Sequence, residues 1–446
     1  MTQQTPSSAS LPVLKVAVLG AGTVGGEVLR LISQQDDDLA HRIGARLEVI
    51  GVMVRDLDRD RGEHVPRSLL TTDASALVRE ADLVIELMGG IQPALDLLLE
   101  AMASGAAVVT ANKALLAAEG PRLYEAADEH GVDLQFEAAV AGAIPIVRPV
   151  RESLAGDRIR RVMGIVNGTT NYILDAMTRT GASFEDALAT AQKLGYAEAD
   201  PTADVQGHDA AAKASILASL AFHSRVALGD VHCEGITSVS ADDIAAAQRM
   251  GRTIKLLSIV ERVEGTDGAE GISARVYPVM IPNAHPLSTV SEAFNAVFVE
   301  AEAAGSLMFY GQGAGGAPTA SAVMGDVVTA ARHRVRGGIG ARESRYAGLD
   351  VIPISELTSR FYLALTVVDE PGVLAQVAGT LSRHGISIST IHQEATPAAE
   401  GAEHGTAVIG ISTHRAQESA MQTALADLTA SPAVQGVDSL LRIEGD

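Results

Sequence analysis

The sequence predicts an α/β protein in which a doubly wound parallel sheet precedes a mixed α+β domain and a small C-terminal βαββαβ domain. Over the first 150 residues, short apolar runs alternate with segments of helical spacing, which is typical of a parallel sheet with crossover helices. The pattern then changes to Ala-rich helical stretches with fewer strands, and two strand–helix–strand units follow residue 358. A chain of 446 residues has room for about three domains.

The first domain is expected at residues 13–150. The run at 13–19 leads directly into a glycine turn and a helical segment, and the other apolar runs are short enough to be buried strands. These further expected strands lie at 47–54, 81–88, 106–111 and 133–138.

Gly20, Gly22 and Gly25 form a G-x-G-x-x-G turn between the first strand and the first helix. The first glycine allows the tight turn, the second lets the backbone approach a pyrophosphate, and the third lets helix and strand pack closely. With Thr23 and Val24, they are the candidate phosphate-binding residues of a Rossmann-type domain, since a helix N-terminus attracts anions. A glycine turn that serves packing alone is the alternative.

The residue after the second strand bears on the choice of cofactor. NAD-type domains place an acid there, whereas this chain has Arg55, followed by Asp56. An arginine can hold a 2′-phosphate, so the sequence favours NADP over NAD, and Asp56 leaves NAD open. An exposed charge at a strand end is the alternative for Arg55.

Later segments show less regular patterns. Residues 151–316 are expected to form the mixed domain, with a strand running into a helix after 158, helices over much of 185–260, and strands at 272–282 and 295–302. Gly, Pro and charged residues without periodicity predict a linker at 335–358, and the C-terminal domain is expected at 359–446.

Composition excludes several classes of protein. The formal net charge is −21 and basic residues form no run, so we expect no nucleic-acid partner. The single cysteine, Cys233, excludes internal disulfides and fits a reducing compartment. We see neither a signal peptide nor an apolar run long enough to span a membrane, and therefore expect a cytoplasmic protein with no membrane partner.

An unusual acidic segment lies at 193–213, "KLGYAEADPTADVQGHDAAAK". It places Glu198, Asp200, Asp204 and Asp209 shortly before Lys213. Asp209 and Lys213, four residues apart, match an ordinary surface ion pair on a helix. The acids ahead of this helix would then be solvated charges of a loop or of the helix N-terminus.

Several motifs together resemble homoserine dehydrogenase over about residues 14–330. They are "ELMGG" (86–90), "TANKALL" (110–116), "GTTNYIL" (168–174), "GYAEADPTADVQGHDAAAKASIL" (195–217) and "EGI" (234–236). The tail "DEPGVLAQVAGTLSRHGISI" separately resembles an ACT domain, a regulatory module. The resemblance implies an NAD(P)-dependent enzyme that interconverts L-aspartate 4-semialdehyde and L-homoserine in threonine, methionine and isoleucine biosynthesis.

The same resemblance implies roles for single residues. Lys213 would be the acid/base, with Asp209 beside it and Lys113 between cofactor and substrate. Glu198 would bind the substrate amino group, with Asp204 nearby. Two further glycines would contact the cofactor. The helix at about 317–334 would return to the cofactor domain. The mixed domain would serve substrate binding and dimerisation. These glycines are Gly168 and Gly316.

The segment "FEAAVAGAIP" (136–145) resembles a monovalent-cation site of this family. The resemblance implies that Glu137 and three backbone carbonyls surround a sodium ion, and oxygen ligands suit such a hard cation. These carbonyls belong to Val140, Gly142 and Ile144. A plain turn in the substrate loop is the alternative.

Asp369 and Gly372 belong to the strand-to-helix turn of the ACT motif. Backbone donors at such a turn can hold an amino-acid carboxylate when a second copy closes the site. The resemblance therefore implies an amino-acid effector, most plausibly L-threonine, and a homodimer or homotetramer. A domain that only assists oligomerisation is the alternative.

Two other functions compete with this interpretation. Another amino-acid-pathway oxidoreductase is the first, but a semialdehyde dehydrogenase needs a nucleophilic thiol, and Cys233 lies before "EGI", where none is required. A catalytically silent nucleotide and amino-acid sensor is the second. It would not need to keep Lys113, Asp209 and Lys213.

Overall fold

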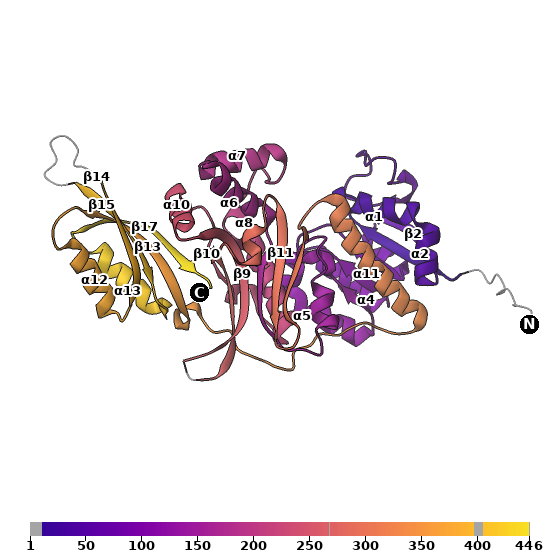
Figure 1. Cartoon of the computed structure of the whole chain (residues 1–446). Coiled ribbons are helices and arrows are strands. Elements are labelled where there is room, and N and C mark those ends of the chain that lie inside the picture. The colour runs from indigo at the N-terminus through magenta and orange to yellow at the C-terminus, as the bar shows by residue number, and fades with distance from the viewer. Residues whose placement is uncertain (1–10, 267, 397–404, 446) are drawn as a thin grey trace, which may run out of the picture. The chain divides into compact units, whose positions relative to one another are not determined.

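The computed structural model describes residues 11–266, 268–396 and 405–445 (Figure 1). The chain divides into two compact units, each considered by itself. The first runs from the described N-terminal residues to Gly156 and includes Gly311–Tyr346, and the second comprises Asp157–Tyr310 and the chain from Ala347 onward.

The first unit contains a six-stranded sheet with all neighbours parallel, in the order β3-β2-β1-β4-β5-β6. This order confirms the predicted doubly wound sheet. The direction of winding reverses between β1 and β4, and dinucleotides bind beyond the carboxyl ends of strands at such a point. The strands are β1 (Val13–Leu19), β2 (Arg46–Met53), β3 (Leu70–Thr71), β4 (Leu83–Glu86), β5 (Ala107–Thr110) and β6 (Leu134–Gln135).

Helices from both chain segments of the first unit pack on this sheet. Ala320, Val323 and Val327 of the late helix α11 share one apolar core with Val16 of β1 and Val28 of α1. Burial of these side chains supplies the main force that holds α11 in the first unit. The helices are α1 (Thr23–Gln34), α2 (Asp36–Ile43), α3 (Ala74–Glu80), α4 (Ala94–Ala103), α5 (Lys113–His130) and α11 (Gly316–Arg336).

The second unit is built on a larger, mixed sheet. Its path begins β12-β11-β7-β9-β10 and continues into the C-terminal domain. The prediction of helices over much of 185–260 was wrong for 252–260, because residues 252–264 form one long strand whose Ile, Leu and Val side chains are mostly buried. The strands are β7 (Ile159–Ile165), β8 (His232–Cys233), β9 (Arg252–Glu264), β10 (Glu270–Pro282), β11 (Phe294–Ala301) and β12 (Gly305–Gln312).

Among the described residues, five α-helices belong to this middle part of the second unit. α6 begins where β7 ends, as the sequence predicted, and α9 is buried over most of its length. A helix with apolar residues on nearly every side is expected inside a protein. The helices are α6 (Gly168–Thr180), α7 (Phe184–Leu194), α8 (Thr202–Val205), α9 (His208–Phe222) and α10 (Ala241–Arg249).

The C-terminal domain has the predicted βαββαβ order, and its two helices pack on one face of the strands (Figure 1). Its last strand, β17, also pairs in parallel with β10 through Val279↔Arg442 and Met280↔Ile443. The strands of the two parts therefore form one sheet, which the sequence pattern does not predict. The elements are β13 (Thr358–Val368), α12 (Val373–Arg383), β14 (Ile388–Thr396), β15 (Thr406–Thr413), β16 (Ala416–Gln417), α13 (Glu418–Thr429) and β17 (Val434–Ile443).

Among the helices of the described residues, none combines the length and apolar character that crossing a membrane requires.

Candidate active site

Lys213 and Asp209 lie one turn apart on the buried helix α9. Their relative exposures are only 7% and 8%. Lys213 Nζ donates to Asp209 Oδ2 at 2.7 Å and to the carbonyl oxygen of Val166 at 2.6 Å. The pair is therefore not an exposed surface ion pair. Electrostatic interactions of these two groups are stronger than at the surface, because the surrounding protein has a low dielectric constant.

Asn167 joins this pair to the acidic loop, and sequence reasoning missed it. Its Nδ2 donates to Asp204 Oδ1 at 2.7 Å and to Asp209 Oδ2 at 2.9 Å. Its Oδ1 accepts from the backbone N–H of Thr170, which caps α6. An asparagine just before a helical segment is a local signal for a helix cap, but nothing local indicates aspartates 37 and 42 residues away.

The loop before α8 carries the other two acids. Thr169 Oγ1 donates to the carbonyl oxygen of Tyr196 at 2.5 Å, which fastens this loop to α6. Asp200 Oδ1 accepts from the backbone N–H of Thr202 at 3.1 Å, so Asp200 shapes the turn. Glu198 is exposed, and no hydrogen bond or ion pair joins its carboxylate to another described residue. The structure thus groups Asp204, Asp209 and Lys213, and leaves Glu198 at the surface of the same loop.

The glycine turn in the first unit has the geometry that phosphate binding needs. Gly20 has φ +101°, and a Cβ there would lie 2.8 Å from the carbonyl oxygen of Leu87. A Cβ on Gly25 would lie 2.2 Å from Gly20 O, whereas Gly22 has nothing within 4 Å. No side chain caps α1, so its first backbone N–H groups, from Thr23 onward, are available to an anion. These residues fit a pyrophosphate.

Lys113 begins α5 beside a buried polar network. Asn112 caps this helix by accepting from Leu115 N, and its Nδ2 donates to the carbonyl oxygen of Gly90 at 2.6 Å. Thr110 Oγ1 donates to Glu86 Oε2 at 2.6 Å and accepts from Asn112 N. The network connects "ELMGG" with "TANK" and fixes the start of α5, where Lys113 is half-buried.

Arg55 follows β2 on a loop whose shape is set by a second arginine. Arg61 donates to the carbonyl oxygens of Asp56 at 2.6 Å and Arg59 at 2.8 Å. Asp56 Oδ1 accepts from Asp58 N, so this carboxylate is engaged within the loop. Arg55 itself is exposed and accessible to a ligand.

Gly168 and Gly316 both lie at close backbone approaches within their own units. A Cβ on Gly316 would lie 2.9 Å from Thr23 Cγ2, so the starts of α11 and α1 meet. A Cβ on Gly168 would lie 2.6 Å from the carbonyl oxygen of Ala293. Packing therefore explains the need for glycine at both positions, whatever else these residues contact.

Glu137 organises the loop that was expected to hold a cation. Its carboxylate accepts from the backbone N–H groups of Ile146 at 2.6 Å, Val147 at 2.7 Å and Arg148 at 2.9 Å. Its own N–H donates to Asp326, and burial raises the pKa of Asp326 to about 7. Within the described residues, no hydrogen bond is donated to the carbonyl oxygens of the three other expected ligands. These are Val140, Gly142 and Ile144.

The turn before α12 was expected to offer backbone donors to a ligand. Gly372 has φ +95° and precedes α12, whose start has no side-chain cap. Asp369 is exposed, and its N–H donates to the carbonyl oxygen of Gly405.

Cys233 does not resemble a nucleophile. Its thiol donates to the carbonyl oxygen of Gln206 at 3.3 Å, and burial raises its pKa. The reactive form of cysteine is the thiolate, which a raised pKa disfavours. This disagrees with a dehydrogenase that acylates a cysteine.

Known proteins match the chain along nearly its whole length. Family models match residues 20–137 as the NAD binding domain of homoserine dehydrogenase, 145–328 as homoserine dehydrogenase, and 361–430 as an ACT domain. The homoserine dehydrogenase of Corynebacterium glutamicum is 54% identical over 433 residues, which cover 97% of this chain and 96% of that protein. The homoserine dehydrogenase of Mycobacterium tuberculosis is 54% identical over 432 residues, with coverages of 96% and 97%.

Solved structures agree. A homoserine dehydrogenase from Thiobacillus denitrificans matches with a TM-score of 0.89 and 38% identity, over 97% of this chain and 98% of its own. A hyperthermophilic archaeal homoserine dehydrogenase in complex with NADPH matches with a TM-score of 0.60 and 26% identity, over 71% and 97%. The chain belongs to the homoserine dehydrogenase family, and is an oxidoreductase that acts on the CH–OH group of homoserine with NAD(P) and carries a C-terminal ACT domain.

Proposed function

We propose that this enzyme interconverts L-homoserine and L-aspartate 4-semialdehyde in threonine, methionine and isoleucine biosynthesis, with NADP as the preferred cofactor. The observation that carries the proposal is the buried pair of Lys213 and Asp209, which Asn167 connects to Asp204. A buried cation that is held by a carboxylate suits a group that moves a proton at the substrate oxygen.

Lys213 handles this proton. In the aldehyde-reducing direction its ammonium stabilises the negative charge that develops on the substrate oxygen and then donates a proton to it. In the homoserine-oxidising direction the lysine must be neutral before it can accept the hydroxyl proton. Asp209 and the Val166 carbonyl fix the position of Nζ in both directions. The nicotinamide supplies or accepts the hydride.

Acids in the loop before α9 recognise the substrate ammonium. We propose Asp204 and Glu198 for this role, because both are carboxylates on the segment that α6 holds through Asn167 and Thr169. The Asn167 amide donates to Asp204 Oδ1 and so orients this carboxylate.

The residues for the cofactor lie in several segments. The pyrophosphate would bind to the turn that comprises Gly20, Gly22, Thr23, Val24 and Gly25. Arg55 would pair with the 2′-phosphate, which supports the NADP preference. The proposed set also includes Lys113, Gly168 and Gly316. Inclusion of Gly316 is supported by its position against Thr23 of the glycine turn.

A sodium ion in the loop around Glu137 is also part of the proposal. Its support is that the carbonyl oxygens of Val140, Gly142 and Ile144 receive no hydrogen bond from another described residue. Oxygen donors suit a hard cation. Glu137 adds negative charge, and it shapes the loop through three backbone N–H groups.

The ACT domain would make the enzyme sensitive to an end product. We propose L-threonine as the effector, bound near Asp369 and Gly372 where α12 begins without a side-chain cap. The proposal includes a homodimer or homotetramer in the cytoplasm, since the facing copy of the domain would close this site.

Initial rates of NADPH oxidation with L-aspartate 4-semialdehyde test the reaction. Replacement of NADPH by NADH tests the cofactor preference, and added L-threonine tests the effector. The absence of turnover in this direction, together with the absence of homoserine oxidation at alkaline pH, would overturn the proposed reaction.

A further inference from the structure

Asn167 lies between two carboxylates of the candidate active site, where β7 leads into α6, and its relative exposure is 6%. Its Nδ2 donates to Asp204 Oδ1 at 2.7 Å and to Asp209 Oδ2 at 2.9 Å, so both N–H groups of the amide are used. Carboxylates that touch the same nitrogen are close enough to repel each other. The amide donors between them offset this repulsion.

The amide of Asn167 can take only one orientation here. Its Oδ1 accepts from the backbone N–H of Thr170 at 2.9 Å, which caps α6. The reverse orientation would remove the cap and turn the amide oxygen toward two carboxylates, with no hydrogen between them. One side chain therefore links the start of α6 to both Asp204 and Asp209.

A second asparagine holds this end of α6 in place. Asn171 Nδ2 donates to three carbonyl oxygens of the segment 290–294, and Lys255 Nζ donates to Asn171 Oδ1 at 2.9 Å. Asn171 and Lys255 are both buried. Side chains that hold a site in its working geometry need such support from packed neighbours. The position of Asn167 is therefore fixed by its surroundings as well as by its own cap.

Asn167 and Lys213 share one acceptor. Asn167 Nδ2 and Lys213 Nζ both donate to Asp209 Oδ2, and the carbonyl oxygen of Val166 also accepts from Nζ. When Lys213 gives its proton to the substrate, Asp209 loses the charge of its partner but keeps the N–H of Asn167. Without this N–H, the buried carboxylate would depend more strongly on the lysine ammonium, and a neutral Lys213 would be less favourable.

We infer that Asn167 is a positioning residue of the reaction, which orients Asp204 for the substrate ammonium and holds Asp209 so that Lys213 can alternate between its charged and neutral forms. The inference deepens the proposed function, on which it rests. A residue that only caps α6 would need Oδ1 alone, whereas this role needs Nδ2. The two possibilities therefore differ in which end of the amide matters.

The other titratable groups around α9 stay the same in a variant of Asn167. Strands β7, β9 and β10 pack on this helix, and the paired residues that face it near its start are uncharged. These are Gly164, Ser258 and Val276. Titratable side chains on or beside α9 include Asp204 of α8, Cys233 of β8, Asp230 after the helix, Arg262 of β9, and His208 and His223 at its ends. Lys113 is a further charged group of the proposed site. Since none of them is altered, a changed pH profile reports on Asn167.

The pH dependence of kcat/KM for homoserine oxidation tests the inference. Asn167→Ser keeps a good helix cap but lacks the amide donors. We expect the midpoint of the limb that rises with pH to move up by about one pH unit or more, because a hydrogen bond to a charged group is worth about tenfold or more in such an equilibrium. Asn167→Ala, which lacks the amide and the cap, should shift the midpoint equally and melt at a lower temperature.

A double-mutant cycle supplies the second readout. Asn167→Ser should raise KM for homoserine about fivefold or more when Asp204 is present. It should change KM little when Asp204→Asn has already removed that carboxylate, because residues that act through one another are not additive. Fully additive effects on KM would show that Asn167 does not act through Asp204.

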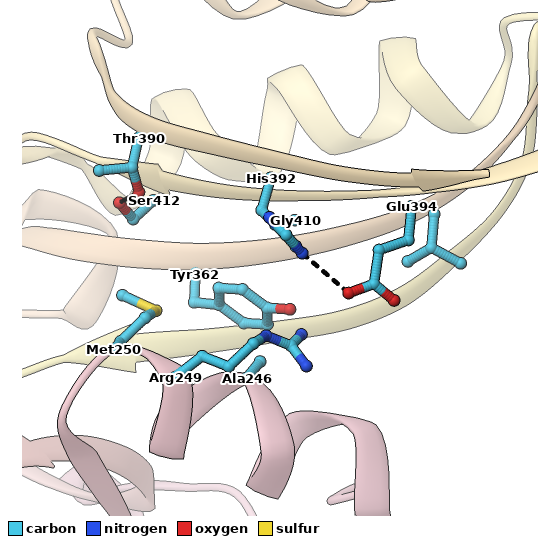
Figure 2. Close-up of a pocket in the computed structure, with 10 residues that line it drawn as sticks. Ala246, Arg249, Met250, Tyr362, Thr390, His392, Glu394, Gly410 and Ser412 are labelled. Carbon is cyan, nitrogen blue, oxygen red and sulfur yellow. Dashed lines mark hydrogen bonds and ion pairs between the residues drawn. The ribbon is translucent and has the colours of Figure 1, made fainter.

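Ser240→Ala is the matched control for the loss of a helix cap. Ser240 caps α10, the helix whose last turn borders the cavity in Figure 2, and its variant should keep the wild-type midpoint and KM. An unchanged midpoint in Asn167→Ser, a shift in Asn167→Ala alone, or an equal shift in Ser240→Ala would each overturn the inference. A wild type without turnover would overturn the proposed reaction and this inference together, whereas turnover in the wild type with unaltered Asn167 variants overturns the inference alone.

Discussion

Lys213 Nζ lies 2.7 Å from Asp209 Oδ2, one helical turn away, and both side chains are buried. Removal of one partner from a buried pair leaves the other charge uncompensated, at a cost of about 3–5 kcal/mol. Substitutions at this pair should therefore lower both stability and turnover. The two effects must be measured separately before a role in catalysis is assigned.

Lys213→Ala should lower kcat at least about 100-fold, because proton transfer by a positioned side chain contributes at least that factor. Binding of NADPH should change little, and fluorescence titration measures it in a sample whose folding has been verified. Lys193→Ala is the matched control, since Lys193 is an exposed lysine on α7. Turnover at the wild-type rate in the Lys213 variant would remove this residue from the mechanism.

Arg55→Ala should weaken NADP about tenfold or more and NAD only slightly, because only NADP carries the 2′-phosphate that an arginine can pair with. The ratio of kcat/KM for the two cofactors measures this. Arg336→Ala, an exposed arginine at the end of α11, is the control. An equal loss for both cofactors would reject the 2′-phosphate role.

Local signals made part of this structure predictable. The glycine turn follows from backbone sterics at Gly20 and Gly25, and the spacing of Asp209 and Lys213 already places them on one face of a helix. Burial of that pair was not predictable, because it depends on how α9 packs. Nor does any local pattern indicate that Asn167 reaches two aspartates, or that β17 pairs with β10.

Glu137 illustrates a second limit of sequence reasoning. The resemblance implied a cation ligand, whereas the most evident contacts of its carboxylate are three backbone N–H groups. Backbone donors are present at every residue except proline, so they leave no side-chain pattern in the sequence. Only the conformation of the loop shows which of them converge on a carboxylate.

Lys255 should make stability depend on alkaline pH. It is buried, it donates to Asn171 Oδ1 and Val290 O, and burial lowers its pKa from 10.5 to about 8. Between these two values the unfolded chain binds a proton that the folded chain does not, so this residue's contribution to stability rises with pH. The contribution is fully present above pH 10.5 and is lost as pH falls through about 8.

Lys255→Met removes this titration. We expect the unfolding free energy of the wild type, relative to this variant, to rise by up to about 3 kcal/mol across that pH range. Urea unfolding at several pH values measures the difference, and Lys193→Met at the exposed site should show no such rise. A difference that is flat with pH would mean that Lys255 keeps its proton in the folded enzyme.

Arg442 should be essential for the junction between the ACT strands and the catalytic part of the second unit. Its guanidinium pairs with Glu418 at 2.9 Å and with Glu234, next to the segment that holds Val205, at 2.8 Å. Arg442→Met leaves the buried Glu418 without its partner, so we expect a loss of about 3–5 kcal/mol in the free energy of unfolding. Urea denaturation measures it, with Arg415→Met, an exposed arginine of the same domain, expected to change by less than about 0.5 kcal/mol. If the free energy of unfolding fell by a similar, small amount in both variants, the junction would not depend on this ion pair. Glu418 would then remain buried without Arg442 at little cost in stability.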